Sequence, residues 1–219
     1  MAKGKKTKPA DAGRDYILVD RSGSMAGRWS DTIGGVNAYA QGLARDSATK
    51  GVRLTVATFD MNGGVRCTFD ILRDSVVADQ WNDIGVNECS PRGGTPLFDA
   101  VGRLVALADK DAPAKAAIVI VTDGEENSSV ELNRERAKQL LDRCRDKGWQ
   151  IIFLGADFDN SAQGASLGNA VHSTVSAEAA QMNCALAETG AMRAKYTKTG
   201  ASMTYSAEQR RRFAPSLGK

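Results

Sequence analysis

The chain has 219 residues, of which 42% are hydrophobic and 25% are charged, and its formal net charge at pH 7 is +3. These values are typical of one soluble domain with a hydrophobic core of its own. The chain lacks any run of 18 or more apolar residues, and its lysine-rich start is not followed by an apolar segment, so neither a membrane-spanning helix nor a cleaved secretion signal is expected. We therefore expect a cytoplasmic protein without a membrane partner.

Both ends of the chain are basic, whereas the part between them is net acidic. Residues 1–10 carry four lysines, and residues 193–219 carry seven basic side chains against Glu208. Such ends can contact nucleic acid, but no aromatic residues accompany the N-terminal lysines, which favours solvated tails and makes a nucleic-acid partner unexpected. The predicted organisation is a basic tail over residues 1–13, one domain over 14–196 and a second basic tail over 197–219.

The four cysteines are too far apart in the sequence to form a zinc-binding pair. Cys67, Cys89, Cys144 and Cys184 contain no C-x-x-C spacing, and His172 is the only histidine. A chain of this size needs no covalent cross-links for stability. The cysteines therefore predict free thiols in a reducing compartment.

The first half of the chain begins with a strand and a helix, continues with a hairpin and ends with a second helix. The apolar run YILVD predicts a buried strand that ends at Asp20, and apolar residues at helical spacing predict a helix over residues 29–47. Strands are expected over residues 52–59 and 64–71, because Asn62-Gly63 between them is a strong hairpin signal. A glycine-rich loop then leads into a helix over residues 96–109.

Strands and helices alternate through the second half. Apolar runs predict strands over residues 115–122, 149–156 and 170–175, and amphipathic patterns predict helices over 130–147, 162–167 and 177–196. This alternation predicts an α/β fold, a Rossmann-like three-layer αβα sandwich with a mostly parallel central sheet and one antiparallel edge strand. Ligands of such sheets bind at the carboxyl ends of the strands.

Polar side chains gather at the predicted carboxyl ends of the strands. Asp20, Ser22 and Ser24 follow the first strand, Thr95 lies in the glycine loop, and Asp123 follows the strand over 115–122. These side chains should converge at one edge of the sheet. Two carboxylates and three hydroxyls without a nearby histidine or cysteine are ligands for Mg²⁺, Mn²⁺ or Ca²⁺ and disfavour zinc and copper.

The three motifs together resemble the von Willebrand factor A domain and its metal-ion-dependent adhesion site. That site reads D-x-S-x-S, then a threonine in a glycine loop, then an aspartate after a later strand, and residues 14–175 carry all five positions in this order. The resemblance implies that Ser22 and Ser24 bind a cation directly, and that Asp20, Thr95 and Asp123 bind it directly or through water. It also implies one open coordination position, which accepts a glutamate or aspartate from a partner protein.

The ligand set suits such a role because only two carboxylates face the ion. Neutral hydroxyls fill much of the remaining coordination sphere, so the cation stays attractive to an external carboxylate. Mg²⁺ is the expected ion, with Mn²⁺ and Ca²⁺ as alternatives. Loop positions predict a rim that selects the partner, formed by Arg21, Met25, Arg28, Glu125, Glu126 and Asn127. For about half of the charged rim residues, solvated loop charges are the alternative interpretation, and Trp29 is either a rim or a core residue.

These observations support three hypotheses about function. The first is a metal-dependent protein-binding module that is not an enzyme. The second is a structural subunit of a multiprotein assembly, such as the tail or baseplate of a bacteriophage virion, in which the metal site is structural or vestigial. The third, a Mg²⁺-dependent phosphoryl-transfer enzyme, requires a nucleophile or base beside the ion, and the sequence offers neither.

Overall fold

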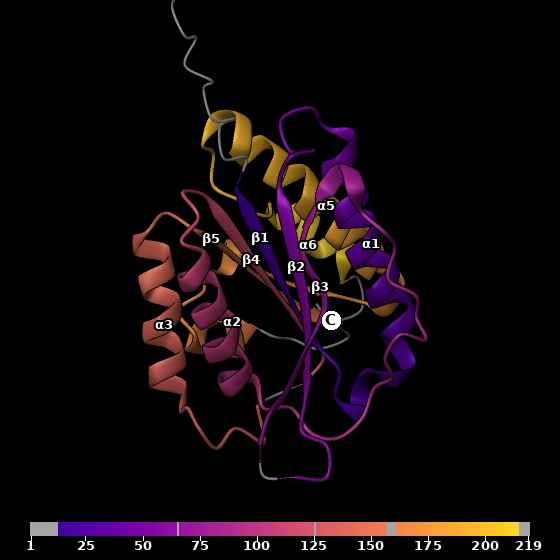
Figure 1. The fold of residues 1–219 in the computed structure, drawn as a ribbon, viewed down its shortest axis with the longest axis vertical. Coiled ribbons are helices and arrows are strands. Elements are labelled where there is room, and N and C mark those ends of the chain that lie inside the picture. Colours follow the sequence, from indigo (N-terminus) through magenta and orange to yellow (C-terminus); the bar gives the residue numbers. More distant parts are fainter. Residues whose placement is uncertain (1–12, 65, 125, 157–160, 215–219) are drawn as a thin grey trace, which may run out of the picture.

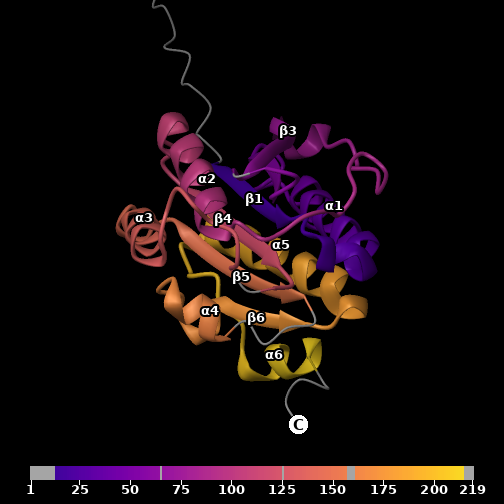
Figure 2. The same cartoon turned by 90° about the horizontal axis from the view of Figure 1, so that it is seen from below.

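The protein is built around a six-stranded sheet in the order β3-β2-β1-β4-β5-β6 (Figures 1 and 2). It is seen here in a computed structural model that describes residues 13–64, 66–124, 126–156 and 161–214. All neighbouring strands are parallel except β2 and β3, which are antiparallel. This arrangement confirms the predicted α/β fold with its antiparallel edge strand. The strands are β1 (Arg14–Asp20), β2 (Arg53–Asp60), β3 (Thr68–Val77), β4 (Ala116–Thr122), β5 (Gln150–Ala156) and β6 (Thr174–Ala177).

Helices cover both faces of the sheet, so each buried strand contributes to two separate hydrophobic cores. In β1, Ile17 and Val19 belong to the core under α1 (Trp29–Arg45) and α5 (Ala179–Thr199), whereas Tyr16 and Leu18 belong to the core under α2 (Leu97–Asp111) and α3 (Arg134–Asp146). This alternation follows from the two-residue period of a strand. The remaining helices are α4 (Ser161–Ser166), α6 (Ala207–Phe213) and short 3₁₀ segments at Gly23–Arg28, Ala78–Gln80 and Val171–Ser173. Among the described residues, none of the helices has the length and hydropathy that a bilayer-spanning segment needs.

Three elements begin four residues later than the sequence pattern predicts. The strands expected from residues 64 and 170 begin at Thr68 and Thr174, the second after a 3₁₀ segment over Val171–Ser173. The helix expected from residue 130 begins at Arg134, because the buried carboxylate of Asp99 accepts the backbone N–H groups of residues 130–132 at 2.7–3.0 Å and holds them outside a helix. The side chain of Asn133 then caps α3 by accepting the N–H of Arg136 at 3.0 Å.

The described residues beyond α5 pack against the domain, where the sequence predicts a basic tail over residues 197–219. Met203, Tyr205 and Phe213 are buried. The rings of Tyr205 and Phe213 meet edge to face, with their centroids 6.0 Å apart. The capping box of Ser206 and Gln209 starts α6. Residues 200–213 therefore add to the core under α1 and α5.

A buried ion pair connects the first strand to the last long helix. The side chains of Asp15 in β1 and Arg193 in α5 are both fully buried, and Arg193 Nε lies 2.6 Å from Asp15 Oδ1. The hydroxyl of Tyr39 in α1 donates to the second oxygen of Asp15 at 2.7 Å. Burial raises the pKa of Asp15, while Arg193 and Tyr39 oppose that rise. One carboxylate thus joins three elements of the fold.

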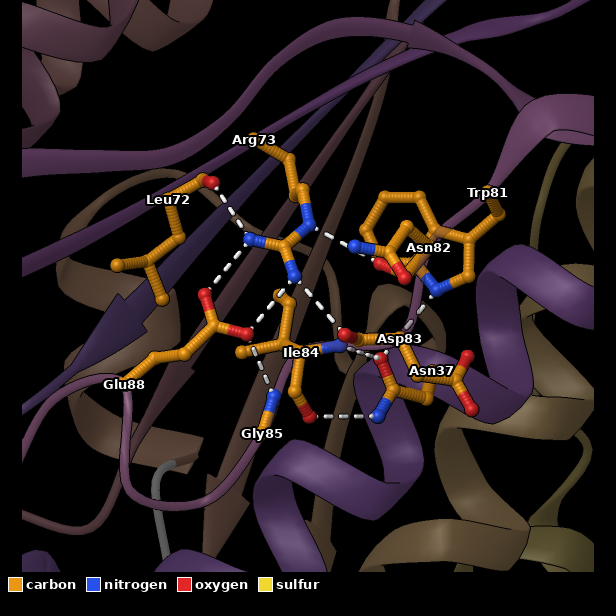
Figure 3. A network of polar contacts seen from close by, with 9 residues as sticks. All are labelled: Asn37, Leu72, Arg73, Trp81, Asn82, Asp83, Ile84, Gly85 and Glu88. Atoms are coloured by element: carbon orange, nitrogen blue, oxygen red, sulfur yellow. Dashed lines mark hydrogen bonds and ion pairs between the residues drawn. The ribbon is translucent and has the colours of Figure 1, made fainter.

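Polar side chains hold residues 81–88, which lie between the sheet and the glycine loop. Asn37 in α1 accepts the N–H of Ile84 at 2.9 Å and donates to its carbonyl at 3.0 Å (Figure 3). From β3, Arg73 donates to the carbonyls of Asn82 and Asp83 and forms two hydrogen bonds with Glu88 at 2.8 and 2.9 Å. These contacts fix an irregular segment without a helix or strand of its own.

The pairing of Arg73 with Glu88 should make part of the stability dependent on pH. Hydrogen bonds from Arg73, and then from the backbone of Gly85, lower the pKa of Glu88 from 4.5 to about 2. Because the folded-state pKa is the lower one, ionised Glu88 stabilises the fold above about pH 4.5, and this contribution is lost as the pH falls toward 2. Denaturation of wild type and Glu88→Gln across this range should show a stability difference that shrinks as the pH falls. A stability difference that is independent of pH would contradict the prediction. Glu135→Gln is the control, because it also removes one negative charge, from an exposed side chain.

Candidate metal centre

The D-x-S-x-S motif forms a tight loop at the carboxyl end of β1. Asp20 is fully buried, with Oδ1 accepting the N–H of Ser22 at 2.7 Å and Oδ2 accepting the hydroxyl of Thr122 at 2.6 Å. The 3₁₀ turn that follows brings the hydroxyl of Ser24 to 3.0 Å from that of Ser22. Ser22 is buried and Ser24 is exposed, so of the two serines only Ser24 reaches the surface.

The glycine loop lies against the ends of β1 and β2 through direct backbone contacts. The carbonyl of Gly93 accepts the N–H of Gly23 at 3.0 Å, and Gly94 exchanges hydrogen bonds with Met61 at 3.0 and 3.1 Å. Gly93 has a φ of +66°, and a Cβ atom there would lie 1.8 Å from the Met61 carbonyl oxygen. Only glycine fits such a close approach. The loop ends at Thr95, which is 2% exposed.

Asp123 brings the third motif to the same place from the end of β4. Its Oδ1 accepts the hydroxyl of Ser24 at 2.7 Å. The next residue, Gly124, lies beside both neighbouring loops, since a Cβ atom there would be 3.9 Å from the Ser24 hydroxyl and 4.0 Å from the Thr95 hydroxyl. The structure therefore brings together all five side chains predicted to bind the cation. That they bind one stays a prediction.

The two carboxylates of the cluster differ in their electrostatic environment. Burial raises the pKa of Asp20 to about 6, although hydrogen bonds from Thr122 and Ser22 oppose the rise, and the charge of Asp123 adds to it. Within the described residues, Asp20 forms no ion pair with a basic side chain. Asp123, by contrast, accepts a hydrogen bond from the guanidinium of Arg28. A buried carboxylate without a counter-charge is destabilised unless positive charge approaches it.

The donor chemistry of the cluster fits a hard divalent cation. In the described parts of the chain, no three His, Cys, Asp or Glu side chains gather into a group that could hold a metal. A cation at this site would therefore depend on two carboxylates and three hydroxyls. All of these ligands are oxygens, which suits Mg²⁺, Mn²⁺ or Ca²⁺.

The residues predicted to form the rim lie in several different environments. Met25 is fully buried in the core, and Arg21 is 4% exposed, with Nε 2.9 Å from Asp60 and Nη2 2.7 Å from Asp70. Arg28 remains partly exposed and also donates to the carbonyl of Ser24 at 3.1 Å. Trp29 is a buried core residue whose indole donates to the carbonyl of Val86 at 3.1 Å.

Two further rim candidates support the loops beside the cluster. The carboxylate of Glu126 accepts backbone N–H groups of residues 98, 128 and 129 at 2.6–2.9 Å, so it caps the start of α2. The side chain of Asn127 accepts the N–H of Thr95 at 3.0 Å. Contact between either residue and a partner stays a prediction, and Glu125 lies outside the described residues.

Asp60 and Arg92 border the cluster, although the sequence analysis did not select them. Asp60 ends β2 and is fully buried, and Arg92 directly precedes the glycine loop and donates from Nε to Asp60 at 2.7 Å. One signal could have identified Asp60, because it is an aspartate at a predicted strand end. Arg92 could have been identified from its position directly before Gly93 and Gly94 in the glycine loop.

The sequence model of the von Willebrand factor type A domain matches residues 16–188. The chain belongs to this family. A search of curated protein sequences found no significant match. Membership of the family agrees with the resemblance of the three motifs, two of which follow β1 and β4, while the third lies in the glycine loop before α2.

Solved structures with the same fold come from several organisms. A von Willebrand factor type A protein from Catenulispora acidiphila has a TM-score of 0.60 and 15% identity, over 83% of this chain and 42% of that one. The vWF domain of the type V pili tip protein Mfa5 from Porphyromonas gingivalis has a TM-score of 0.62 and 12% identity, over 89% and 98%. The manganese-loaded TRAP protein of Plasmodium vivax has a TM-score of 0.53 and 17% identity, over 79% and 70%. At these identities the likeness shows the fold of the VWA domain.

Substitution of Gly93 should disrupt the glycine loop of this VWA domain. Gly93→Ala forces a methyl group against the Met61 carbonyl at a positive φ, so the loop must move, and we expect a loss of about 1–3 kcal/mol in unfolding free energy. Gly27→Ala is the matched control, because a Cβ atom there meets no heavy atom within 4 Å. Urea denaturation of both variants tests this, and equal stabilities would contradict the close contact.

Proposed function

We propose that this VWA domain is a metal-dependent protein-binding module. A divalent cation held by Asp20, Ser22, Ser24, Thr95 and Asp123 binds an acidic side chain of a partner protein. The observation that carries the proposal is the fully buried carboxylate of Asp20, which accepts the hydroxyl of Thr122 and the N–H of Ser22 and forms no ion pair within the described residues. A cation supplies the charge that this carboxylate lacks.

The identity of the ion and its reactivity follow from the ligand set. Two carboxylates only balance the charge of a divalent ion, and neutral hydroxyls fill the other positions, so the ion stays electrophilic toward a carboxylate from outside. Mg²⁺ is the expected ion, with Mn²⁺ and Ca²⁺ as alternatives. The manganese-loaded TRAP structure supports a divalent cation in this fold.

A binding role is favoured over a catalytic one. The only histidine, His172, lies in the 3₁₀ segment that precedes β6, and thus at the opposite edge of the sheet from the cluster. No general base is therefore available from an imidazole beside the ion. The pili tip protein Mfa5 supports a partner within a larger protein assembly. A bacteriophage virion and a cytoplasmic location remain predictions from the sequence.

Metal binding can be tested without knowing the partner. Isothermal titration calorimetry and thermal unfolding in MgCl₂, MnCl₂ or CaCl₂ should show binding and stabilisation of the wild type, and an ion at a hundred times its Kd adds about 2.7 kcal/mol. Asp20→Asn and Asp123→Ala should abolish both effects, since each removes a negative charge from the ligand set.

Asp146→Ala is the control for these variants, because Asp146 is exposed at the end of α3, near the opposite edge of the sheet. It should retain full metal binding. Absence of heat and stabilisation in the wild type would refute the proposal, as would an unchanged response in Asp20→Asn. The isosteric Asn variant retains the shape of the side chain, so a loss of binding cannot be attributed to a cavity.

A further inference from the structure

We infer that Arg92 binds a second carboxylate of the same partner, so that the partner is an acidic segment with two closely spaced carboxylates. One carboxylate coordinates the cation and the other pairs with the Arg92 guanidinium. The inference rests on the proposed function and specifies the chemistry of its partner.

Arg92 is attached directly to the loops of the metal cluster. Its N–H donates to the carbonyl of Arg21 at 2.7 Å, and Arg21 lies between the predicted ligands Asp20 and Ser22. In the other direction, Arg92 precedes Gly93 and lies three positions before Thr95. The residue that Arg92 contacts and the residues that follow it in the chain therefore both lie at the carboxyl edge of the sheet, toward which β1 runs in Figure 1.

A buried carboxylate fixes the direction of the Arg92 side chain. Arg92 Nε lies 2.7 Å from Oδ2 of Asp60, and Arg21 Nε lies 2.9 Å from the same oxygen. Asp60 is fully buried, and its other oxygen, Oδ1, has no hydrogen-bond partner among the described residues. The second nitrogen of Arg21 pairs with Asp70, so Arg21 is neutralised from two sides and remains inside the protein.

The outer end of Arg92 is available for a ligand. Its side chain is 43% exposed, and within the described residues its terminal nitrogens Nη1 and Nη2 have no hydrogen-bond partner. Anchoring at Nε leaves these two nitrogens as a planar fork, the geometry that binds a carboxylate with two parallel hydrogen bonds. Because Asp60 already restricts the side chain, less rotamer freedom is lost on binding.

Arg28, a partly exposed arginine that also lies beside the cluster, is less suited to this role. Arg28 donates to Asp123, one of the predicted metal ligands, and to the carbonyl of Ser24. Its guanidinium is therefore engaged by the site itself. Arg92 instead contacts Asp60, which is not among the predicted ligands, so its outer N–H groups can donate to a carboxylate without withdrawing a ligand from the cation.

Synthetic peptides test the inference directly. The probes are capped glycine-serine peptides with a single glutamate, or with a second glutamate placed one, two or three residues further on, titrated by NMR or calorimetry in saturating Mg²⁺ and in chelator. At least one two-glutamate peptide should bind the wild type roughly tenfold more tightly than the single-glutamate peptide, because a charge-assisted bond contributes about that factor. Chelator should abolish binding of both kinds of peptide.

Substitution of Arg92 should remove only the preference for the second glutamate. Arg92→Gln should bind every peptide as weakly as the single-glutamate peptide while its Mg²⁺ affinity is unchanged, and Arg92→Lys should lose part of the preference because it lacks the fork. Arg53→Gln is the matched control, because it removes one positive charge from the opposite end of β2. It should keep the wild-type preference.

The possible failures are distinguishable. If Mg²⁺ does not bind to the wild type, or if the peptides bind equally well in chelator, the proposed function itself is wrong. If Mg²⁺ binds but no peptide does, both the carboxylate-binding function and the role of Arg92 are refuted. Equal affinity for one- and two-glutamate peptides, or a preference that survives in Arg92→Gln, overturns the inference alone.

Discussion

The close backbone contact between the glycine loop and the ends of β1 and β2 is the constraint on which the site depends. Gly93 meets Gly23 on one side and Met61 on the other, at distances that leave no room for a side chain at Gly93. Backbone hydrogen bonds therefore place Thr95 beside the serine loop. Side chains from separate parts of the chain, those predicted to bind a cation, are thus brought together by main-chain contacts.

The polar side chains near the cluster differ in whether hydrogen-bond donors or ion pairs already satisfy them. Glu126 and Asn127 satisfy backbone N–H groups at the start of α2 and at Thr95, and Asp99 does the same for residues 130–132. These three acceptors therefore already have backbone donors. Asp20 is different, because Thr122 and Ser22 donate to it but no basic side chain of the described residues pairs with it. The strongest attraction for an added cation is therefore concentrated at one buried group.

Much of the fold and the set of clustered side chains could be predicted from the sequence, because both depend on simple periodic patterns. Apolar runs located the strands, and the carboxyl ends of parallel strands meet at one edge whatever the details of packing. The start of α3 could not be predicted, since it depends on the distant side chain of Asp99. The orientation of Arg21 was equally inaccessible, because Asp60 and Asp70 come from other strands. The sequence around a residue does not indicate which distant side chains will contact it in the fold.

The buried pair of Asp15 and Arg193 has a consequence for how the chain reaches its final state. The two residues are 178 positions apart, yet each is the other's counter-charge, and both side chains are fully buried. Burial of one such charge without its partner typically costs several kilocalories per mole. Burial of Asp15 is therefore favourable only when the last long helix docks against the first strand and brings Arg193 to it. The core under α1 and α5 thus depends on two segments from opposite ends of the domain.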